Sequence, residues 1–154
     1  MNISAGLLLF RRTSAEVEVF LAHPGGPFWK NKEAGAWTIP KGLIADGEDL
    51  LAAAKREFTE ETGIEPTGPF LELGSIRQKA GKLIHAWAWE GDADPAGVTS
   101  NTFLIEFPRG SGRRIEILEV DRCEWFALAR AREKINPAQA ELLDQLSRIL
   151  ASPA

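Results

Sequence analysis

One segment, residues 48–62 (EDLLAAAKREFTEET), constrains the fold of this chain more than any other, because nearly every local signal in it favours a helix. Asp49 is a residue type that caps helix N-termini, three consecutive alanines occupy the middle, and Gly63 is suited to end the helix. Successive helical residues turn by about 100°, which gathers three apolar side chains on one stripe. These are Leu51, Ala54 and Phe58. The chain is therefore expected to bury this stripe against a core.

Three carboxylates crowd the sector of this helix that borders the apolar stripe: Glu57, Glu60 and Glu61. Like charges at this spacing repel each other and destabilise a helix. A solvated charged face with an ion pair between Arg56 and Glu60 accounts for part of the pattern. A site for a hard divalent cation accounts for the whole cluster, because Mg²⁺ and Mn²⁺ take carboxylate oxygens as ligands. The helix alone leaves both interpretations open.

Apolar runs on both sides of the helix predict β-strands. Residues 3–12 and 17–24 predict a hairpin, and residues 36–40 (AWTIP) predict a short strand that ends at Pro40. Further strands are expected at 70–78, 82–91, 102–107 and within 120–125, and further helices at 127–134 and 137–150. Strands around a mid-chain helix, with helices at the end, predict a mixed α/β sandwich in a single domain over residues 1–154.

The bulk composition limits the partners and the compartment. The 154 residues carry a net charge of −4, which argues against binding of duplex nucleic acid but allows a small phosphorylated ligand. The longest apolar run near the start is too short to span a membrane and does not resemble a signal peptide. The single cysteine, Cys123, cannot form an internal disulfide and fits a reducing compartment. A cytoplasmic protein with no membrane partner is therefore expected.

The loop before the helix completes a longer pattern, residues 42–64 (GLIADGEDLLAAAKREFTEETGI). This stretch resembles the Nudix box at every specified position, with Phe58 standing where an aliphatic residue is more usual. The matching positions are Gly42, Glu48, Arg56, Glu57, Glu60, Glu61, Gly63 and Ile64. The resemblance implies a Nudix-type α/β/α sandwich with a mixed sheet and a loop–helix–loop catalytic motif.

The resemblance also implies roles for the residues of the box. The ligands of an Mg²⁺ or Mn²⁺ ion would be Glu57, Glu60, Glu61 and, through its backbone carbonyl, Lys41. Glu48 and Arg56 would form an ion pair that holds the loop against the helix. Nudix hydrolases use such a metal centre to cut a phosphoanhydride bond in a nucleoside diphosphate that is linked to another moiety.

The catalytic carboxylates are expected among Glu57, Glu60 and Glu119, and the identity of the general base is left open. Glu57 is one candidate for the base. Glu119 is another, because it lies six residues before Trp125, a spacing that resembles the diadenosine polyphosphate hydrolases. The alternative for Glu119 is an exposed carboxylate at the end of a strand.

Substrate contacts are expected outside the box. Residues 37–42 (WTIPKG) resemble diadenosine and diphosphoinositol polyphosphate hydrolases, which would put the ammonium group of Lys41 near a phosphate. Trp29 lies in a predicted loop and could stack on a base, although packing against the protein is the more common role of a tryptophan. Arg77 and Lys82 flank a turn and could either reach phosphate oxygens or lie on the surface of a hairpin.

The favoured substrate is a nucleotide, above all a nucleoside or dinucleoside polyphosphate. The alternatives are a pool-cleaning nucleoside triphosphate pyrophosphatase, an ADP-ribose or diphosphoinositol polyphosphate hydrolase, and a non-catalytic nucleotide sensor. The sequence is compatible with a monomer and with a homodimer.

Overall fold

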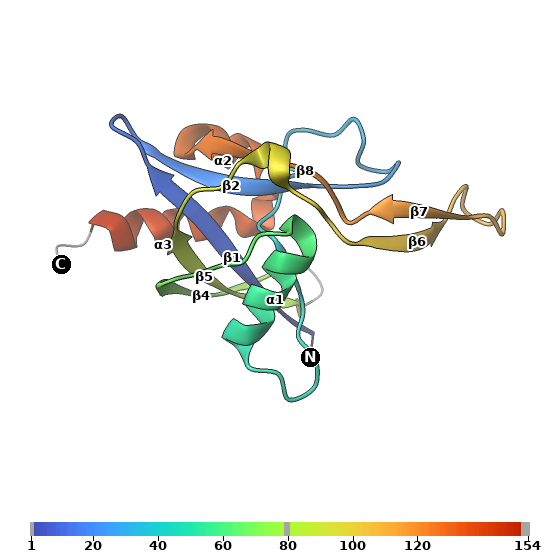
Figure 1. Cartoon of the computed structure of the whole chain (residues 1–154), viewed down its shortest axis with the longest axis horizontal. Coiled ribbons are helices and arrows are strands. Elements are labelled where there is room, and N and C mark those ends of the chain that lie inside the picture. The colour runs from blue at the N-terminus through green and yellow to red at the C-terminus, as the bar shows by residue number, and fades with distance from the viewer. Residues whose placement is uncertain (1, 79–80, 152–154) are drawn as a thin grey trace.

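A mixed six-stranded sheet forms the centre of the computed structural model, which describes residues 2–78 and 81–151 (Figure 1). Its main strands lie in the order β4-β5-β1-β2-β8, and β3 pairs with the start of β1. β1 and β5 are parallel, and the other neighbours are antiparallel. The strands are β1 (Ile3–Arg12), β2 (Val17–Pro24), β3 (Lys41–Leu43), β4 (Phe70–Arg77), β5 (Leu83–Glu90) and β8 (Val120–Ala127).

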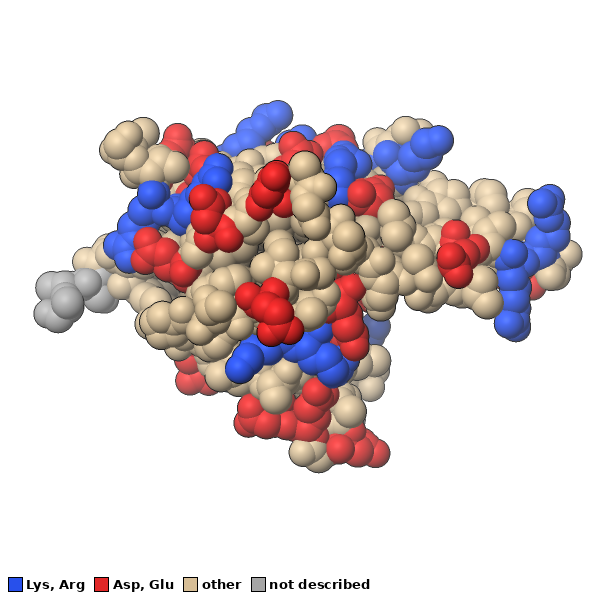
Figure 2. All heavy atoms as spheres, in the orientation of Figure 1, with Lys and Arg blue, Asp and Glu red and all other residues tan. Residues whose placement is uncertain are grey.

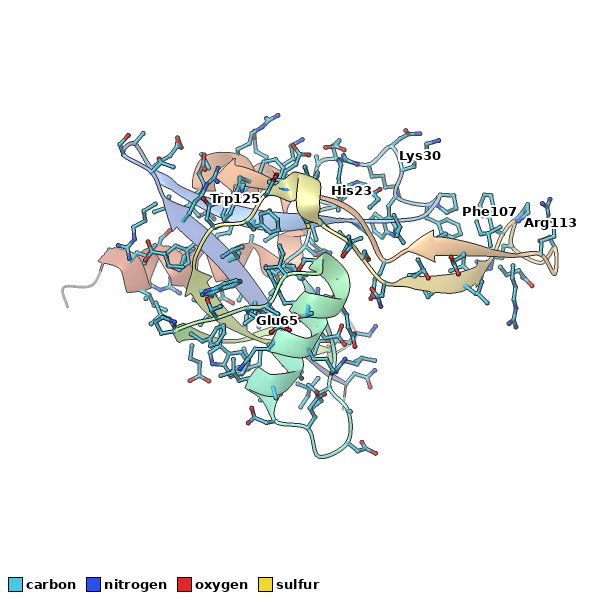
Figure 3. The ribbon with its side chains drawn as sticks, in the orientation of Figure 1. His23, Lys30, Glu65, Phe107, Arg113 and Trp125 are labelled. Carbon is cyan, nitrogen blue, oxygen red and sulfur yellow. The ribbon has the colours of Figure 1, made fainter. Side chains whose placement is uncertain are left out.

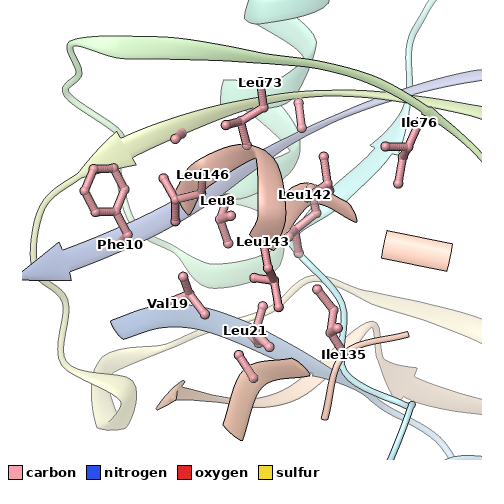
Figure 4. Close-up of a cluster of buried hydrophobic side chains, with 14 of the residues drawn as sticks. Leu8, Phe10, Val19, Leu21, Leu73, Ile76, Ile135, Leu142, Leu143 and Leu146 are labelled. Atoms are coloured by element: carbon pink, nitrogen blue, oxygen red, sulfur yellow. The ribbon is translucent and has the colours of Figure 1, made fainter. Parts of the chain in front are cut away.

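Helices cover both faces of this sheet, which confirms the predicted α/β/α sandwich. Helix α1 (Leu50–Thr62) packs on one face, where Phe58 meets the buried side chains of Leu7 and Leu9. The C-terminal elements pack on the other face of the sheet. There Leu142 lies in a second buried cluster with Leu8, which is the β1 residue between Leu7 and Leu9 (Figure 4). Alternate residues of β1 therefore serve opposite cores. The C-terminal elements are α2 (Leu128–Lys134), the 3₁₀ helix η3 (Pro137–Gln139) and α3 (Ala140–Ala151).

A separate two-stranded hairpin projects from the body of the molecule (Figure 1). It consists of β6 (Thr102–Glu106) and β7 (Arg114–Leu118), and the short 3₁₀ helix η2 (Pro95–Gly97) precedes it. Basic side chains gather at its tip, away from the sheet (Figure 2). Strand β7 is not among the sequence predictions, because its five residues alternate in character only over a short stretch after a glycine-containing turn.

The strand predicted at residues 36–40 is wrong. Only two isolated bridges occur there, one from Thr38 to Ala22 and one from Trp37 to Ile135. The segment divides its hydrogen bonds among several neighbours, and Pro40 contributes only its carbonyl, which accepts from the N–H of Leu7. A continuous ladder begins one residue later, with β3.

Among the residues that the structure describes, no helix is long and apolar enough to cross a membrane.

Candidate metal and substrate site

Local capping fixes the two ends of α1. The Asp49 side chain accepts a hydrogen bond from the N–H of Ala52 at 3.0 Å, as an N-cap does. Gly63 ends the helix in the left-handed conformation, with φ at 76°, and its N–H donates to the carbonyl of Thr59. The predicted N-cap and C-terminal glycine are confirmed, so the position of the glutamates along the helix is set by local signals.

Gly42 allows α1 to approach β3 closely. A Cβ atom at this position would lie 2.2 Å from the carboxyl carbon of Glu57. Such a contact is far inside van der Waals distance, so any side chain here would displace the Glu57 carboxylate. The glycine therefore leaves room for a buried acid beside the backbone of β3.

Three carboxylates converge at this place: Glu57, Glu61 and Glu119. Glu57 and Glu61 come from α1 and are 8% and 4% exposed, and Glu119 comes from the junction of β7 and β8. Each offers an oxygen, and these oxygens all lie within 4.8 Å of one another. An all-oxygen group of this size fits the ligand preference of Mg²⁺ or Mn²⁺.

The electrostatics of the cluster favour a bound cation. Burial, followed by the charges of Glu119 and Glu57, raises the pKa of Glu61 to about 9. Burial also raises the pKa of Glu57, although Arg56 opposes this shift. Groups that resist ionisation when alone become good ligands once a divalent ion offsets their repulsion. The residues present therefore fit a hard divalent ion.

Arg56 connects the box loop to the helix. Its Nε and Nη2 donate to the two carboxylate oxygens of Glu48 at 2.8 and 2.9 Å. Glu48 also accepts from the N–H of Ala45 at 2.9 Å, and mainly the Arg56 contact lowers the pKa of Glu48 to about 2. This bidentate pair holds the loop against α1, which is the geometry that the resemblance implies for the two residues.

Glu60 does not join the three converging carboxylates. Its half-exposed side chain accepts from Nη1 of Arg56, at 3.2 Å to each oxygen. The same Nη1 donates to Glu57 at 2.9 Å. In this structure Glu60 forms the helical ion pair, and Glu119 completes the cluster in its place.

A pocket of about 320 Å³ opens beside the carboxylates. Glu61, Glu119 and Lys41 line it together with Trp29, whose side chain is partly exposed. A second pocket, of about 410 Å³, adjoins the first, and Lys82 lines it. Arg77, exposed at the end of β4, lines neither of these two pockets. Of the four predicted substrate contacts, Lys41 and Trp29 line the same pocket as Glu61 and Glu119, and Lys82 lines the adjoining pocket.

Other residues of this pocket are not among the sequence predictions. They include Phe103 from β6, Gln78 after β4, and Asn136 and Gln139 at η3. Each comes from an element far from the box in sequence, and an isolated carboxamide or phenylalanine carries no motif. The Asn-Pro pair at the start of η3 predicts a turn but gives no sign of a pocket.

The loop that carries Trp29 is tied to the strand that follows Glu119. His23 is fully buried at the end of β2, and its Nδ1 lies 2.9 Å from a carboxylate oxygen of Asp121. Its Nε2 lies 2.6 Å from the carbonyl of Lys32, in the loop that also carries Lys30 (Figure 3). The N–H of Gly25 donates to the carbonyl of Glu119 at 3.1 Å. The aromatic and carboxylate sides of the pocket are thus held together.

Comparison with known proteins assigns the chain to a family: the model of the NUDIX domain matches residues 2–146. An RNA pyrophosphohydrolase of Azorhizobium caulinodans is 29% identical over 158 aligned residues, which cover 93% of this chain and 88% of that protein. Nudix hydrolase 7 of Arabidopsis thaliana is 37% identical over 76 residues, 49% of this chain. The match covers only 25% of that relative's length.

Solved structures share the fold at low identity. The Ap4A hydrolase of C. elegans, in a binary complex, superposes with a TM-score of 0.69 at 23% identity, covering 96% of this chain and 98% of the other. The NUDIX domain of Shewanella oneidensis NrtR, complexed with ADP ribose, gives 0.68 at 18% identity, covering 97% and 88%.

Proposed function

Since the chain belongs to the NUDIX family, we propose that it hydrolyses a phosphoanhydride bond in a nucleoside diphosphate linked to another moiety, most specifically a nucleoside or dinucleoside polyphosphate. The observation that carries the proposal is the convergence of Glu57, Glu61 and Glu119 beside a pocket large enough for a nucleotide. A buried acidic cluster of this kind is costly without a cation. The proposed cofactor is therefore Mg²⁺ or Mn²⁺.

Each residue near the cluster has a proposed task. Glu57, Glu61 and Glu119 would hold the ion, with Glu60 and the Lys41 carbonyl as further proposed ligands. A divalent ion held there would neutralise charge on the phosphate oxygens. The ammonium group of Lys41, which lines the pocket, would bind a phosphate directly.

The hydrolytic step follows from these positions. The oxygen of a water molecule attacks phosphorus, the bridging P–O bond breaks, and the leaving phosphate departs as an anion. Glu57 or Glu119 takes the proton of the attacking water, since both carboxylates reach the cluster. The pair of Arg56 and Glu48 stays outside this step and keeps α1 in position.

The aromatic side of the pocket supports a nucleotide as the substrate. Trp29 and Phe103 both line the pocket and are both partly exposed, so their rings are available to a base. Lys82 in the adjoining pocket would meet a more distant phosphate, and Arg77 would reach only a substrate that extends beyond both pockets. The names of two similar proteins, RNA pyrophosphohydrolase and Ap4A hydrolase, point to polyphosphate substrates of this kind.

The test is a panel of substrates, with products identified, in Mg²⁺ and in Mn²⁺. It includes diadenosine polyphosphates, canonical nucleoside triphosphates, triphosphorylated RNA, ADP-ribose and diphosphoinositol polyphosphates. Glu61→Gln removes a cluster carboxylate, and Glu65→Gln is the matched control at an exposed position just after α1. Hydrolysis that is lost in Glu61→Gln and kept in Glu65→Gln supports the proposal. Nucleotide binding without any metal-dependent turnover would replace it with a sensor role.

A further inference from the structure

His23 is a fully buried histidine at the end of β2 that the proposed function does not use. Its Nε2 lies 2.6 Å from the carbonyl oxygen of Lys32, and its Nδ1 lies 2.9 Å from a carboxylate oxygen of Asp121. A carbonyl can only accept, so Nε2 must carry a hydrogen. A carboxylate can also only accept, so Nδ1 must carry one as well. Both contacts are hydrogen bonds only when the imidazole ring holds two protons and is a cation.

The charged groups around the ring suit an imidazolium. Glu33 places a carboxylate oxygen 4.0 Å from Nε2, and Glu33 is itself paired with Lys134 at 3.3 Å. Nη1 of Arg122 lies 3.5 Å from the oxygen of Asp121 that faces His23, an environment that suits a carboxylate anion. A buried charge is tolerated when it is both paired and hydrogen-bonded. The ring of His23 meets both conditions.

The two partners of the ring lie on opposite walls of the pocket. On one side, the N–H of Lys32 donates to the carbonyl of Trp29 at 3.0 Å, so the residue that His23 holds also fixes the turn that carries the tryptophan. On the other side, Asp121 follows Glu119 by two residues. Trp29 and Glu119 both line the first pocket, whereas His23 does not. One buried ring therefore connects the aromatic wall to the strand that begins beside a cluster carboxylate.

We propose that His23, as a doubly protonated imidazolium, is a positioning residue that holds Trp29 against the base of a bound nucleotide; the inference rests on the proposed function. His23 acts only through the loop that it ties to β8. When the ring loses a proton, one of its nitrogens faces an acceptor without a hydrogen, and an attraction becomes a repulsion between lone pairs. The loop is then released from β8, and Trp29 loses its fixed place.

The first test is the substitution His23→Gln, measured by kcat and KM for the preferred nucleotide. Glutamine keeps a donor for the loop carbonyl but turns its amide oxygen toward the carboxylate of Asp121. His85→Gln is the matched control, because His85 is the other histidine of the chain and also contacts a carboxylate, that of Glu72. We expect His23→Gln to raise KM severalfold, up to the roughly tenfold effect of losing the Trp29 ring, and to leave kcat nearly unchanged. His85→Gln should change neither value.

A double-mutant cycle separates positioning of Trp29 from a general structural role. In the Trp29→Ala background, His23→Gln should raise KM no further, because the loop then has no ring to hold. A histidine that only stabilises the fold would weaken both backgrounds to the same extent. An equal increase of KM in the two backgrounds would therefore overturn the inference.

The second test replaces the carboxylate and also serves if His23→Gln fails to fold. In Asp121→Asn the new amide can donate to Nδ1 of a neutral ring, while Nε2 keeps its hydrogen for Lys32. The KM of wild type should rise with pH as the ring loses its second proton, and the KM of Asp121→Asn should stay constant over the same range. Glu61 is the same in both proteins, so the difference between the two profiles isolates His23. Equal profiles would contradict the imidazolium.

Nuclear magnetic resonance of protein labelled with ¹⁵N-histidine reads the protons directly, and the chain has only two histidines to assign. The His23 ring should show two N–H groups in wild type and one, at Nε2, in Asp121→Asn. A wild-type ring with a single N–H under the conditions of the assay would overturn the inference. If no nucleotide is hydrolysed, calorimetric binding of the same nucleotides replaces KM. Failure of the proposed activity then remains separate from failure of the positioning role.

Discussion

The backbone N–H of Lys41 donates to a carboxylate oxygen of Glu61 across 3.1 Å, which joins β3 to α1 at the edge of the pocket. The contact places Glu61, the carboxyl group of the cluster with the most strongly raised pKa, next to Lys41, whose side chain we expect to bind a phosphate.

Glu61 should make the metal-free protein less stable as the pH rises. Burial raises the pKa of Glu61 from its ordinary value of 4.5 to about 9, so the stability tied to its protonated form is complete below pH 4.5 and is lost as the pH approaches 9. Each pH unit in this window costs the fold up to about 1.4 kcal/mol. In a chelator, the midpoint temperature of thermal unfolding should therefore fall more steeply with rising pH for wild type than for Glu61→Gln. Parallel plots of this temperature against pH would refute the raised pKa of Glu61.

Arg56→Lys should loosen the box loop. Lysine cannot reproduce the two parallel hydrogen bonds to Glu48, and it leaves Glu57 and Glu60 without the contact to Nη1. We expect a loss of about 1–3 kcal/mol in the free energy of unfolding and a clear drop in kcat. Arg130→Lys, in an exposed pair with Glu133, is the control for the same exchange at the surface. Equal effects of the two substitutions in denaturant titrations would contradict the bracing role.

Glu60→Gln should impair turnover less than Glu61→Gln does. Glu60 is half exposed and paired with Arg56, whereas Glu61 is buried among the converging carboxylates. Losing a peripheral carboxylate weakens the cation site, but losing a central one removes it. Steady-state kinetics at saturating Mg²⁺ would show the order, and a Glu60→Gln enzyme as damaged as Glu61→Gln would mean that Glu60 turns toward the ion when it binds.

Trp29→Ala should raise KM for a nucleotide by about tenfold and leave kcat nearly unchanged, because a stacked aromatic contributes about 1–3 kcal/mol to binding of a base. Phe28→Ala in the same loop is the control, since Phe28 is 57% exposed, packs against Phe107 and does not line the pocket. If both variants raise KM equally, the loop as a whole matters and stacking by Trp29 does not.

The residues of the site differ in how far the sequence could predict them. Helix α1 and its caps follow from local signals between residues 48 and 63, so the sequence alone predicts them. The pair of Glu48 and Arg56 is predicted only through the resemblance to the Nudix box. Glu119 is a candidate only because its spacing from Trp125 resembles that in the diadenosine polyphosphate hydrolases. Nothing local could place Gln139 in the pocket, because its contact with Ile39 spans 100 residues and depends on how the C-terminal elements pack on the sheet. The same long-range packing explains why the strand predicted at residues 36–40 is wrong: this segment bridges to Ala22 in β2 and to Ile135 after α2, and it forms no continuous ladder with either.

Calorimetric titration with Mn²⁺ tests most directly whether Glu57, Glu61 and Glu119 form one divalent cation site. The proteins compared are wild type, Glu61→Gln, Glu119→Gln and the control Glu65→Gln. Wild type and Glu65→Gln should bind Mn²⁺ with the same affinity, and the two cluster variants should bind at least about tenfold more weakly. Equal Mn²⁺ affinity in all four proteins would show that these carboxylates do not form the cation site.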